Sequence, residues 1–295
     1  MRMTLRLRNL LSAVPAFLLA SIVLIAPLIA TAAWSQPAPP GKPETKSATV
    51  LVMDEGDGTV LYAKQSKKVM PVASITKLMT ALVVLESKEP LDEELTILSV
   101  DRERTKASAS RLAVGSKLTR GELLHLALMS SENRAAQAVG RAHPGGLPAF
   151  IKQMNVRARE LGMKSTRFAD PTGLSSDNVS TAADLVKLVI AASHEPLIEK
   201  YSTSEKLTVK VGRQMLEFRN TNSLTSKDDW DISVQKTGYT QLAGQCLVMK
   251  AIIQDRPTVI VLLNSFGKLT RVADARRIRR WMERGADTQM ARAGK

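Results

Sequence analysis

The sequence is poor in the residue types on which much covalent and metal chemistry depends. Its 295 residues include one cysteine and three histidines, and aromatic residues make up 4% of the chain. A single cysteine excludes an intrachain disulfide. Cys246 lies in the apolar stretch GQCLVM, where we expect a packed side chain rather than a reactive thiol. The histidines are not spaced as metal ligands, so we expect no metal, no cofactor and no thiol catalysis.

Acidic residues are fewer than basic ones. The chain carries 42 Lys and Arg against 28 Asp and Glu, which gives a formal net charge of +14 and a pI near 10.0. Such a balance suits an anionic partner: nucleic acid, lipid headgroups or a cell-wall polymer. The run Arg276-Arg277-Ile278-Arg279-Arg280 is interpreted as a solvated helix face, with contact to an anionic surface as the alternative.

Residues 1–33 have the pattern of a secretory signal peptide. Three arginines lie among the first eight residues, an uncharged and mostly apolar run extends from Leu10 to Ala30, and Ala30-Thr31-Ala32 offers a cleavage site. The apolar run is long enough to span a membrane, so an uncleaved anchor is the alternative. Export argues against nucleic acid as a partner and leaves at most peripheral contact between the mature protein and a membrane.

The rest of the chain predicts one folded domain. Residues 34–46 are polar and proline-rich, as in an extended linker; the domain is expected over 47–285 and a short polar tail over 286–295. Strands are predicted at about 48–54, 59–65, 231–237, 245–253 and 257–264, and helices at about 74–86, 119–129, 146–161, 181–192 and 270–284. Strands at both ends around a helical block predict one antiparallel sheet and an α+β fold.

The stretch PVASITKLMT places Ser74 and Lys77 on one face of a predicted helix, in otherwise apolar surroundings. A buried lysine is costly unless it has a partner or a function. A serine hydroxyl becomes nucleophilic when a base takes its proton, and a lysine with a lowered pKa can be that base. Ser-x-x-Lys alone is a weak signal, because a surface lysine on a helix with a serine N-cap has the same spacing.

Two further motifs strengthen the interpretation. Ser131-Glu132-Asn133 follows an apolar helix, and Lys236-Thr237-Gly238 lies at the end of a predicted strand. Ser-x-x-Lys, Ser-x-Asn and Lys-Thr-Gly, in this order, form the signature of penicillin-binding proteins and class A β-lactamases. Glu132 stands where the signature usually has Asp.

From about Ser47 to Trp281 the sequence resembles the low-molecular-mass penicillin-binding proteins, the D-alanyl-D-alanine carboxypeptidases and endopeptidases, and among these the endopeptidase type. The segments that carry the resemblance are ASITKLMTALVVLE, ALMSSENRAA, PGGLPAFI, DPTGLSSDNVSTAADLVKL, FRNTNSL and QKTGYTQLAGQCLVM. The resemblance implies a β-lactamase/transpeptidase-like fold, with an antiparallel sheet flanked by helices and an all-helical subregion. It also implies peptidoglycan stem peptides and cross-bridges as substrates, β-lactams as covalent inhibitors and a periplasmic location.

The resemblance further implies roles for the catalytic residues. Ser74 would be the acylated nucleophile, and Lys77 would deprotonate it and later help to activate water. Ser131 would relay a proton to the leaving amine. Arg271 is a candidate for carboxylate recognition.

The same resemblance implies the substrate-binding residues. Asn133 would hold Lys77 and the substrate amide. Lys236 and Thr237 would hold the substrate carboxylate or tune the potential of the site. Gly238 would let the substrate backbone lie against the strand. The backbone N–H groups of Ser74, at the start of its helix, and of Tyr239 would be the two oxyanion donors.

Several alternatives remain open at this point. A class A β-lactamase needs a glutamate to drive deacylation, but the only acids between Asn133 and Ser175 are Glu160 and Asp170, so we expect a long-lived penicilloyl adduct. A Ser-His-Asp triad is less economical, and a non-catalytic wall-binding protein is a distant alternative. The motifs do not distinguish an endopeptidase from a carboxypeptidase; a short C-terminus favours the endopeptidase.

Overall fold

The structure is a computed structural model that describes residues 41–102 and 110–293, with side chains to residue 285. The predicted signal peptide and most of the predicted linker lie outside these ranges. None of the helices within them is both long enough and apolar enough to cross a membrane.

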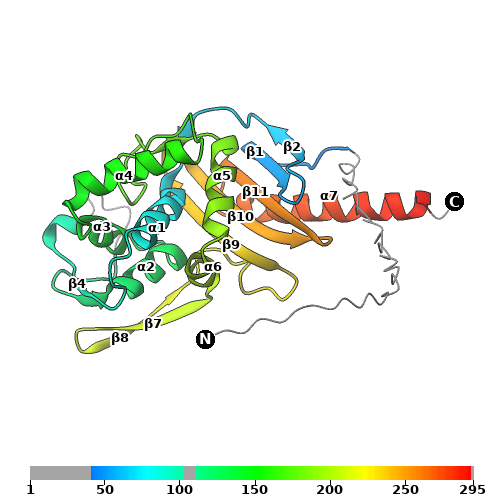
Figure 1. Cartoon of the computed structure of the whole chain (residues 1–295). Coiled ribbons are helices and arrows are strands. Elements are labelled where there is room, and N and C mark those ends of the chain that lie inside the picture. The colour runs from blue at the N-terminus through cyan, green and yellow to red at the C-terminus, as the bar shows by residue number, and fades with distance from the viewer. Residues whose placement is uncertain (1–40, 103–109, 294–295) are drawn as a thin grey trace, which may run out of the picture. The chain divides into compact units, whose positions relative to one another are not determined.

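A five-stranded antiparallel sheet lies at the centre of the domain, in the order β2-β1-β11-β10-β9 (Figure 1). Strands β1 and β2 come from the start of the domain, and β9, β10 and β11 come from its end. Their bounds are β1 Ser47–Asp54, β2 Val60–Lys64, β9 Asp231–Thr240, β10 Gly244–Ile253 and β11 Arg256–Ser265. Because β1 pairs with β11, the prediction of one sheet built from both ends of the chain is confirmed.

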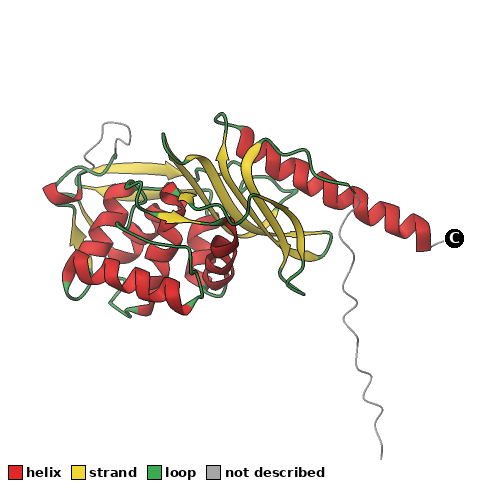
Figure 2. Cartoon of the chain, turned by 90° about the horizontal axis from the view of Figure 1, so that it is seen from above, coloured by secondary structure: helices red, strands yellow, loops and turns green. Residues whose placement is uncertain are grey.

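Both faces of this sheet are covered. Alternate side chains of a strand point to opposite faces, and in β1 Leu51 enters one apolar core while Val50 and Val52 enter a second. Helix α5 (Ala182–Ser193) packs on the first face, and α7 (Thr270–Ala293) contacts β1, β10 and β11 with residues of the second core (Figure 2). The α7 residues in that core are Ala275, Ile278, Trp281 and Met282.

The all-helical subregion surrounds helix α1 (Thr76–Glu86), in which every residue from 76 to 84 is buried. The helices that contact α1 are α2 (Arg120–Met129), α3 (Asn133–Arg141), α4 (Gly146–Glu160), α5 and α6 (Pro196–Thr203). The short strand pairs are β3 (Met70–Pro71) with β6 (Val179–Ser180), β4 (Glu94–Thr96) with β5 (Lys117–Thr119), and β7 (Lys206–Val211) with β8 (Gln214–Arg219). The motif-bearing helix α1 therefore lies inside the domain.

The structure adds elements that the sequence did not predict. Helix α3 has the sequence NRAAQAVGR and packs through small buried residues such as Ala135 and Ala136. The segment 88–118 was expected to be rich in loops, yet it contains β4 and most of β5. Helix α7 was expected to end near residue 284 but continues through Ala293, because a single Gly285 weakens a helix by only about 1 kcal/mol and no proline follows it.

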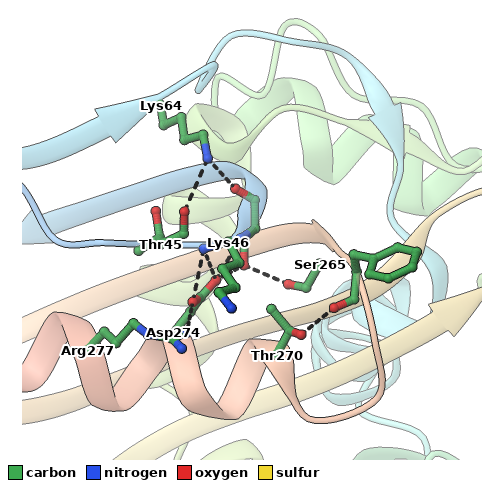
Figure 3. A network of polar contacts seen from close by, with 9 residues as sticks. Thr45, Lys46, Lys64, Ser265, Thr270, Asp274 and Arg277 are labelled. Atoms are coloured by element: carbon green, nitrogen blue, oxygen red, sulfur yellow. Dashed lines mark hydrogen bonds and ion pairs between the residues drawn. The ribbon is translucent and has the colours of Figure 1, made fainter.

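A buried carboxylate ties the start of the sheet to α7 (Figure 3). Asp274 is completely buried, and its Oδ2 accepts hydrogen bonds from the backbone N–H of Lys46 (3.0 Å) and Ser47 (2.7 Å) and from Ser47 Oγ (2.6 Å). Arg277 Nη1 donates to Oδ1 at 2.7 Å, and Ser47 Oγ lies 2.6 Å from Ser265 Oγ. We call these five residues the Asp274 clasp; it joins β1, β11 and α7.

Candidate active site

Ser74 lies in a tight turn, the 3₁₀ helix η1 (Ala73–Ile75), that leads directly into α1. Ala73 has a φ of +49°, a left-handed conformation that is costly for a residue with a side chain. Two glycines allow other segments to approach this turn closely. A Cβ on Gly173 would lie 1.9 Å from Ala73 O, and a Cβ on Gly238 would lie 3.1 Å from Ser74 N. The turn therefore requires glycine at 173, and a side chain at 238 would press on it.

Lys77 follows on α1 and is completely buried. Its Nζ lies 2.9 Å from Ser74 Oγ, 2.7 Å from Asn133 Oδ1 and 2.7 Å from the carbonyl oxygen of Thr172. The two carbonyl oxygens can only accept, so each takes an N–H of the lysine. A neutral amine then has its lone pair available for the Ser74 hydroxyl proton, whereas an ammonium group would donate to all three oxygens. This geometry suits transfer of a proton from Ser74 to Lys77.

The second motif lies in the connection between α2 and α3. Ser131 has a φ of +61°, and the Glu132 carboxylate caps α3 by accepting the N–H of Arg134 at 3.2 Å. This turn brings Asn133, the first residue of α3, to Lys77. Ser131 is half-buried in the same connection, two residues from that contact. Its function as a proton relay stays a prediction.

The loop at 169–175 completes the surroundings of Lys77, a role that the sequence alone did not predict. Its carboxylate Asp170 accepts the N–H groups of Thr172 (2.6 Å), Gly173 (2.7 Å) and Ser175 (2.7 Å). These bonds hold the loop so that the Thr172 carbonyl meets Lys77 Nζ. The signal was present in the sequence, because Asp-Pro-Thr-Gly is a turn pattern in which Asp binds following backbone N–H groups.

The third motif lies near the end of β9, which is an edge strand of the sheet. Lys236 is completely buried, and its Nζ donates to the Thr237 carbonyl at 2.9 Å. Burial, and then the positive charges of Lys77 and Arg271, hold the pKa of Lys236 well below its usual range. The structure thus gathers two buried amines and a guanidinium in one region, where each disfavours charge on its neighbours.

The other residues of this strand are held in place by polar contacts. Thr237 Oγ1 lies 2.6 Å from Thr221 Oγ1, and Arg271 Nη1 donates to the carbonyls of Gly238 (2.8 Å) and Cys246 (3.3 Å). Arg271 thereby links β9 to β10, and its role in carboxylate recognition stays a prediction. The Tyr239 side chain is 60% exposed. Alternate N–H groups of an edge strand point away from the sheet, so an oxyanion contact from the Tyr239 N–H is a prediction that this placement allows.

A cavity of about 650 Å³ adjoins Asn133 and the 169–175 loop. Its wall includes η2 (Ser99–Asp101), α3 and the 169–175 loop. Asn133 and Thr172, whose carbonyl oxygens accept hydrogen bonds from Lys77, both line it. This volume is within the range of about 300–1,000 Å³ that small-molecule sites occupy. Among the described residues, those that line this cavity include two partners of Lys77 but neither Ser74 nor the residues of β9.

Two other reactive side chains lie apart from this chemistry. Cys246 is completely buried, and burial raises the pKa of its thiol to about 11, which agrees with a packed rather than a reactive cysteine. His125 stacks on Tyr201 with ring centroids 4.3 Å apart, and burial lowers the pKa of the imidazole to about 4. The stacking of His125 on Tyr201 involves neither Ser74 nor Lys77.

The family model and the relatives that match this chain are all described as D-alanyl-D-alanine peptidases. The model of the peptidase S11 family, described as D-alanyl-D-alanine carboxypeptidase, matches residues 35–267. The chain is 47% identical to a D-alanyl-D-alanine endopeptidase of Pseudomonas aeruginosa, over 90% of this chain and 88% of the relative. It is 46% identical to a D-alanyl-D-alanine endopeptidase of Escherichia coli, over 83% of this chain and 79% of the relative.

Solved structures show the same fold. The DD-transpeptidase of Streptomyces K15 is 30% identical, with a TM-score of 0.76 over 82% of this chain and 98% of that protein. Penicillin-binding protein D2 of Listeria monocytogenes, solved with cefotaxime bound, is 27% identical with a TM-score of 0.73, over 83% of this chain and 99% of that protein. The expected transpeptidase-like α+β fold is confirmed, and the chain belongs to peptidase family S11, the serine peptidases of the D-alanyl-D-alanine carboxypeptidase family.

Proposed function

We propose that this protein is an exported serine D,D-peptidase that hydrolyses peptidoglycan through an acyl-serine intermediate and cuts D-Ala–diaminopimelate cross-links. The observation that carries the proposal is the position of Lys77 Nζ, 2.9 Å from Ser74 Oγ and 2.7 Å from two carbonyl oxygens. The relatives named D-alanyl-D-alanine endopeptidase support the substrate class.

In the acylation step, Ser74 Oγ attacks the carbonyl carbon of the donor D-Ala while its proton passes to Lys77 Nζ. The N–H groups of Ser74 and Tyr239 stabilise the oxyanion, and Gly238 leaves room beside the first of them. The C–N bond of the cross-link then breaks, and the proton reaches the leaving amine through Ser131. Lys236 and Thr237 hold the carboxylate of the leaving residue, and Asn133 holds Lys77 and the donor amide.

In the deacylation step, a water molecule attacks the ester with Lys77 as the base and Ser74 as the leaving group. With penicillin as the acyl donor we expect this step to be slow. Glu160, at the end of α4, pairs with Arg157 at 3.2 Å, and the carboxylate of Asp170 accepts backbone N–H groups of its own loop. Both acids between Asn133 and Ser175 are thus engaged elsewhere, which supports a long-lived penicilloyl adduct.

The location and domain limits belong to the same proposal. We place the protein in the periplasm, with a signal peptide at 1–33, a linker at 34–46 and a catalytic domain from residue 47. Removal of terminal D-Ala as a carboxypeptidase is the second candidate function, because it uses the same groups, and more distant relatives carry that name.

The first test is covalent labelling by a fluorescent penicillin. The unmutated protein should acquire one label per chain and keep it through denaturing electrophoresis, whereas Ser74→Ala should acquire none. Absence of labelling in the unmutated protein would favour the non-catalytic alternative, and rapid release of hydrolysed penicillin would favour a β-lactamase.

The second test is digestion of purified peptidoglycan followed by separation of the fragments. We expect cross-linked dimers to fall and uncross-linked fragments to rise. Constant dimers together with pentapeptides trimmed to tetrapeptides would instead establish the carboxypeptidase.

A further inference from the structure

Four large apolar side chains are exposed at the end of the sheet where β9 leaves the site. The exposed fractions are 60% for Tyr239, 70% for Leu242, 90% for Phe266 and 72% for Leu269. We call these four residues the rim patch. Single exposed apolar residues need no explanation, but a group of them beside a functional site indicates a binding surface.

Strand pairing shows that the members of the rim patch share one end of the sheet. Tyr239 lies opposite Gln245, and Gln245 lies opposite Ser265, the residue before Phe266. Neighbouring strands are about 4.8 Å apart, so Tyr239 and Ser265 are separated by roughly 10 Å. Leu242 lies in the turn between β9 and β10, which is at the same end.

The connection from β11 to α7 is also tied to the site. Arg271 lies two residues after Leu269, and its Nη1 donates to the carbonyl of Gly238 at 2.8 Å. Gly238 in turn lies against the Ser74 turn. The rim patch is therefore continuous with the strand that borders the nucleophile.

The roles proposed for β9 give the substrate a direction. The leaving residue lies at Lys236 and Thr237, and the scissile carbonyl lies at the N–H of Tyr239. The substrate, followed from its leaving residue toward the acyl-donor strand, therefore runs along β9 toward the end of that strand at Thr240. The donor strand, upstream of its D-Ala, continues toward the rim patch.

Length and charge agree with this occupant. An extended peptide covers about 3.3 Å per residue. A donor strand that turns across the end of the sheet beyond Thr240 therefore needs roughly three residues to cover the 10 Å from β9 to the end of β11. Lys268, which is exposed and lies two residues after Phe266 in the chain, supplies a cation for the carboxylates of a stem peptide. The apolar side chains suit the alkyl chain of a diamino acid and the apolar faces of sugars.

From these observations we infer that the rim patch binds the stem peptide of the acyl-donor strand, two to four residues upstream of the scissile bond. The inference rests on the proposed function and extends it: recognition reaches beyond the D-Ala that is attacked. It assigns Leu242, Phe266 and Leu269 to substrate selection, although none of them belongs to the three motifs.

The test compares two synthetic cross-linked substrates that share one leaving strand. In the first, the donor is a complete disaccharide stem peptide; in the second, the donor is shortened to an acetylated diamino acid followed by D-Ala. The Phe266→Ser/Leu242→Ser variant should lose about tenfold in kcat/KM on the first substrate, because about 1.4 kcal/mol of apolar contact disappears. It should change less than about twofold on the second substrate and in penicillin acylation.

Met215→Ser is the matched control, since Met215 is 64% exposed on β8, outside the β9–β11 end of the sheet. It should behave as the unmutated enzyme on both substrates. Equal losses of the double variant on both substrates, or no loss on either, would overturn the inference. So would unchanged kinetics accompanied by lost sedimentation with phosphatidylglycerol vesicles, which would assign the patch to a lipid surface.

The outcome also separates this inference from the proposed function. If the unmutated enzyme cuts neither substrate, the endopeptidase proposal fails, and the donor-strand inference fails with it. If the unmutated enzyme cuts both and the double variant cuts both equally well, the inference alone fails.

Discussion

The Asp274 clasp and the active site both bury charged groups, but they do so in opposite ways. Asp274 meets two backbone N–H groups, a hydroxyl and a guanidinium, so its charge is compensated in the folded state. In the active site, Lys236 donates to a carbonyl, and the nearby Lys77 and Arg271 make its charge less favourable. Compensated burial stabilises a fold, whereas uncompensated burial produces amines that can give and take protons.

The largest expected effect is on catalysis. Lys77→Ala should lower the rate of penicillin acylation by about 10²–10⁴-fold or more, because the Ser74 proton loses its acceptor. Thermal unfolding should stay cooperative, with the fold intact. The rate is measured with a fluorescent penicillin, with Lys152→Ala, an exposed lysine on α4, as the control. Retained labelling would remove Lys77 as the base.

The clasp should show the reverse pattern. Asp274→Ala leaves buried donors without an acceptor, so we expect a loss of about 3 kcal/mol in the free energy of unfolding. For a domain of this size that corresponds to a fall of roughly 6–12 °C in Tm. Calorimetry and penicillin acylation are measured on the same sample. A lower acylation rate at a temperature where the variant is folded would show that the two regions are coupled.

The variant Lys236→Met distinguishes the effect of the buried Lys236 amine on stability from its effect on catalysis. Lys236→Met should raise the free energy of unfolding by about 1–2 kcal/mol at pH 7 and weaken the capture of penicillin. The pKa of Lys236 is lower in the folded than in the unfolded state, so between those two values the unfolded state binds more protons and the lysine destabilises the fold. Raising the pH toward the usual value of 10.5 removes this penalty.

The difference in stability between Lys236→Met and the unmutated protein should therefore shrink as the pH rises from 7 to 10.5. Denaturant titrations at several pH values measure it. A constant difference would show that the stability change comes from packing instead, and unaltered acylation kinetics would refute the role of Lys236 in the site.

The smallest effect is expected at the edge of the clasp. Arg277→Met removes the ion pair between Arg277 and Asp274. The Arg277 guanidinium is partly exposed, and ion pairs with a solvent-exposed partner contribute less than about 1 kcal/mol to stability. The neutral donors of Lys46 and Ser47 remain. Denaturant unfolding at low and high salt measures the change. A loss as large as that of Asp274→Ala would mean that the ion pair, rather than the neutral donors, holds the clasp together.

Much of the site was predictable because its chemistry depends on short motifs. Ser74 and Lys77 are three residues apart, and a helix places such residues on one face. That local rule predicted that the two side chains lie close together, and the structure places Lys77 Nζ 2.9 Å from Ser74 Oγ. Asn133 was predicted as a partner of Lys77 from the family resemblance, and the structure places it at 2.7 Å.

The contribution of the Thr172 carbonyl could not be predicted in the same way. It is a backbone group, so its residue type carries no signal, and it reaches Lys77 only because Asp170 folds the loop and Gly173 passes close to Ala73. The clasp depends likewise on residues 227 and 228 positions apart in the chain. Such contacts require a folded domain to bring them together.

The sequence by itself determined the α+β class, the antiparallel sheet from both chain ends and the order of the three motifs, because periodicity and i, i+3 spacing are local properties. Only the tertiary structure decided how Lys77 and Lys236 share one buried region, how the 169–175 loop closes over Lys77, and which apolar residues remain exposed at the rim. Those outcomes depend on burial and on the mutual distance of charges, and both are set by long-range packing rather than by neighbours in the chain.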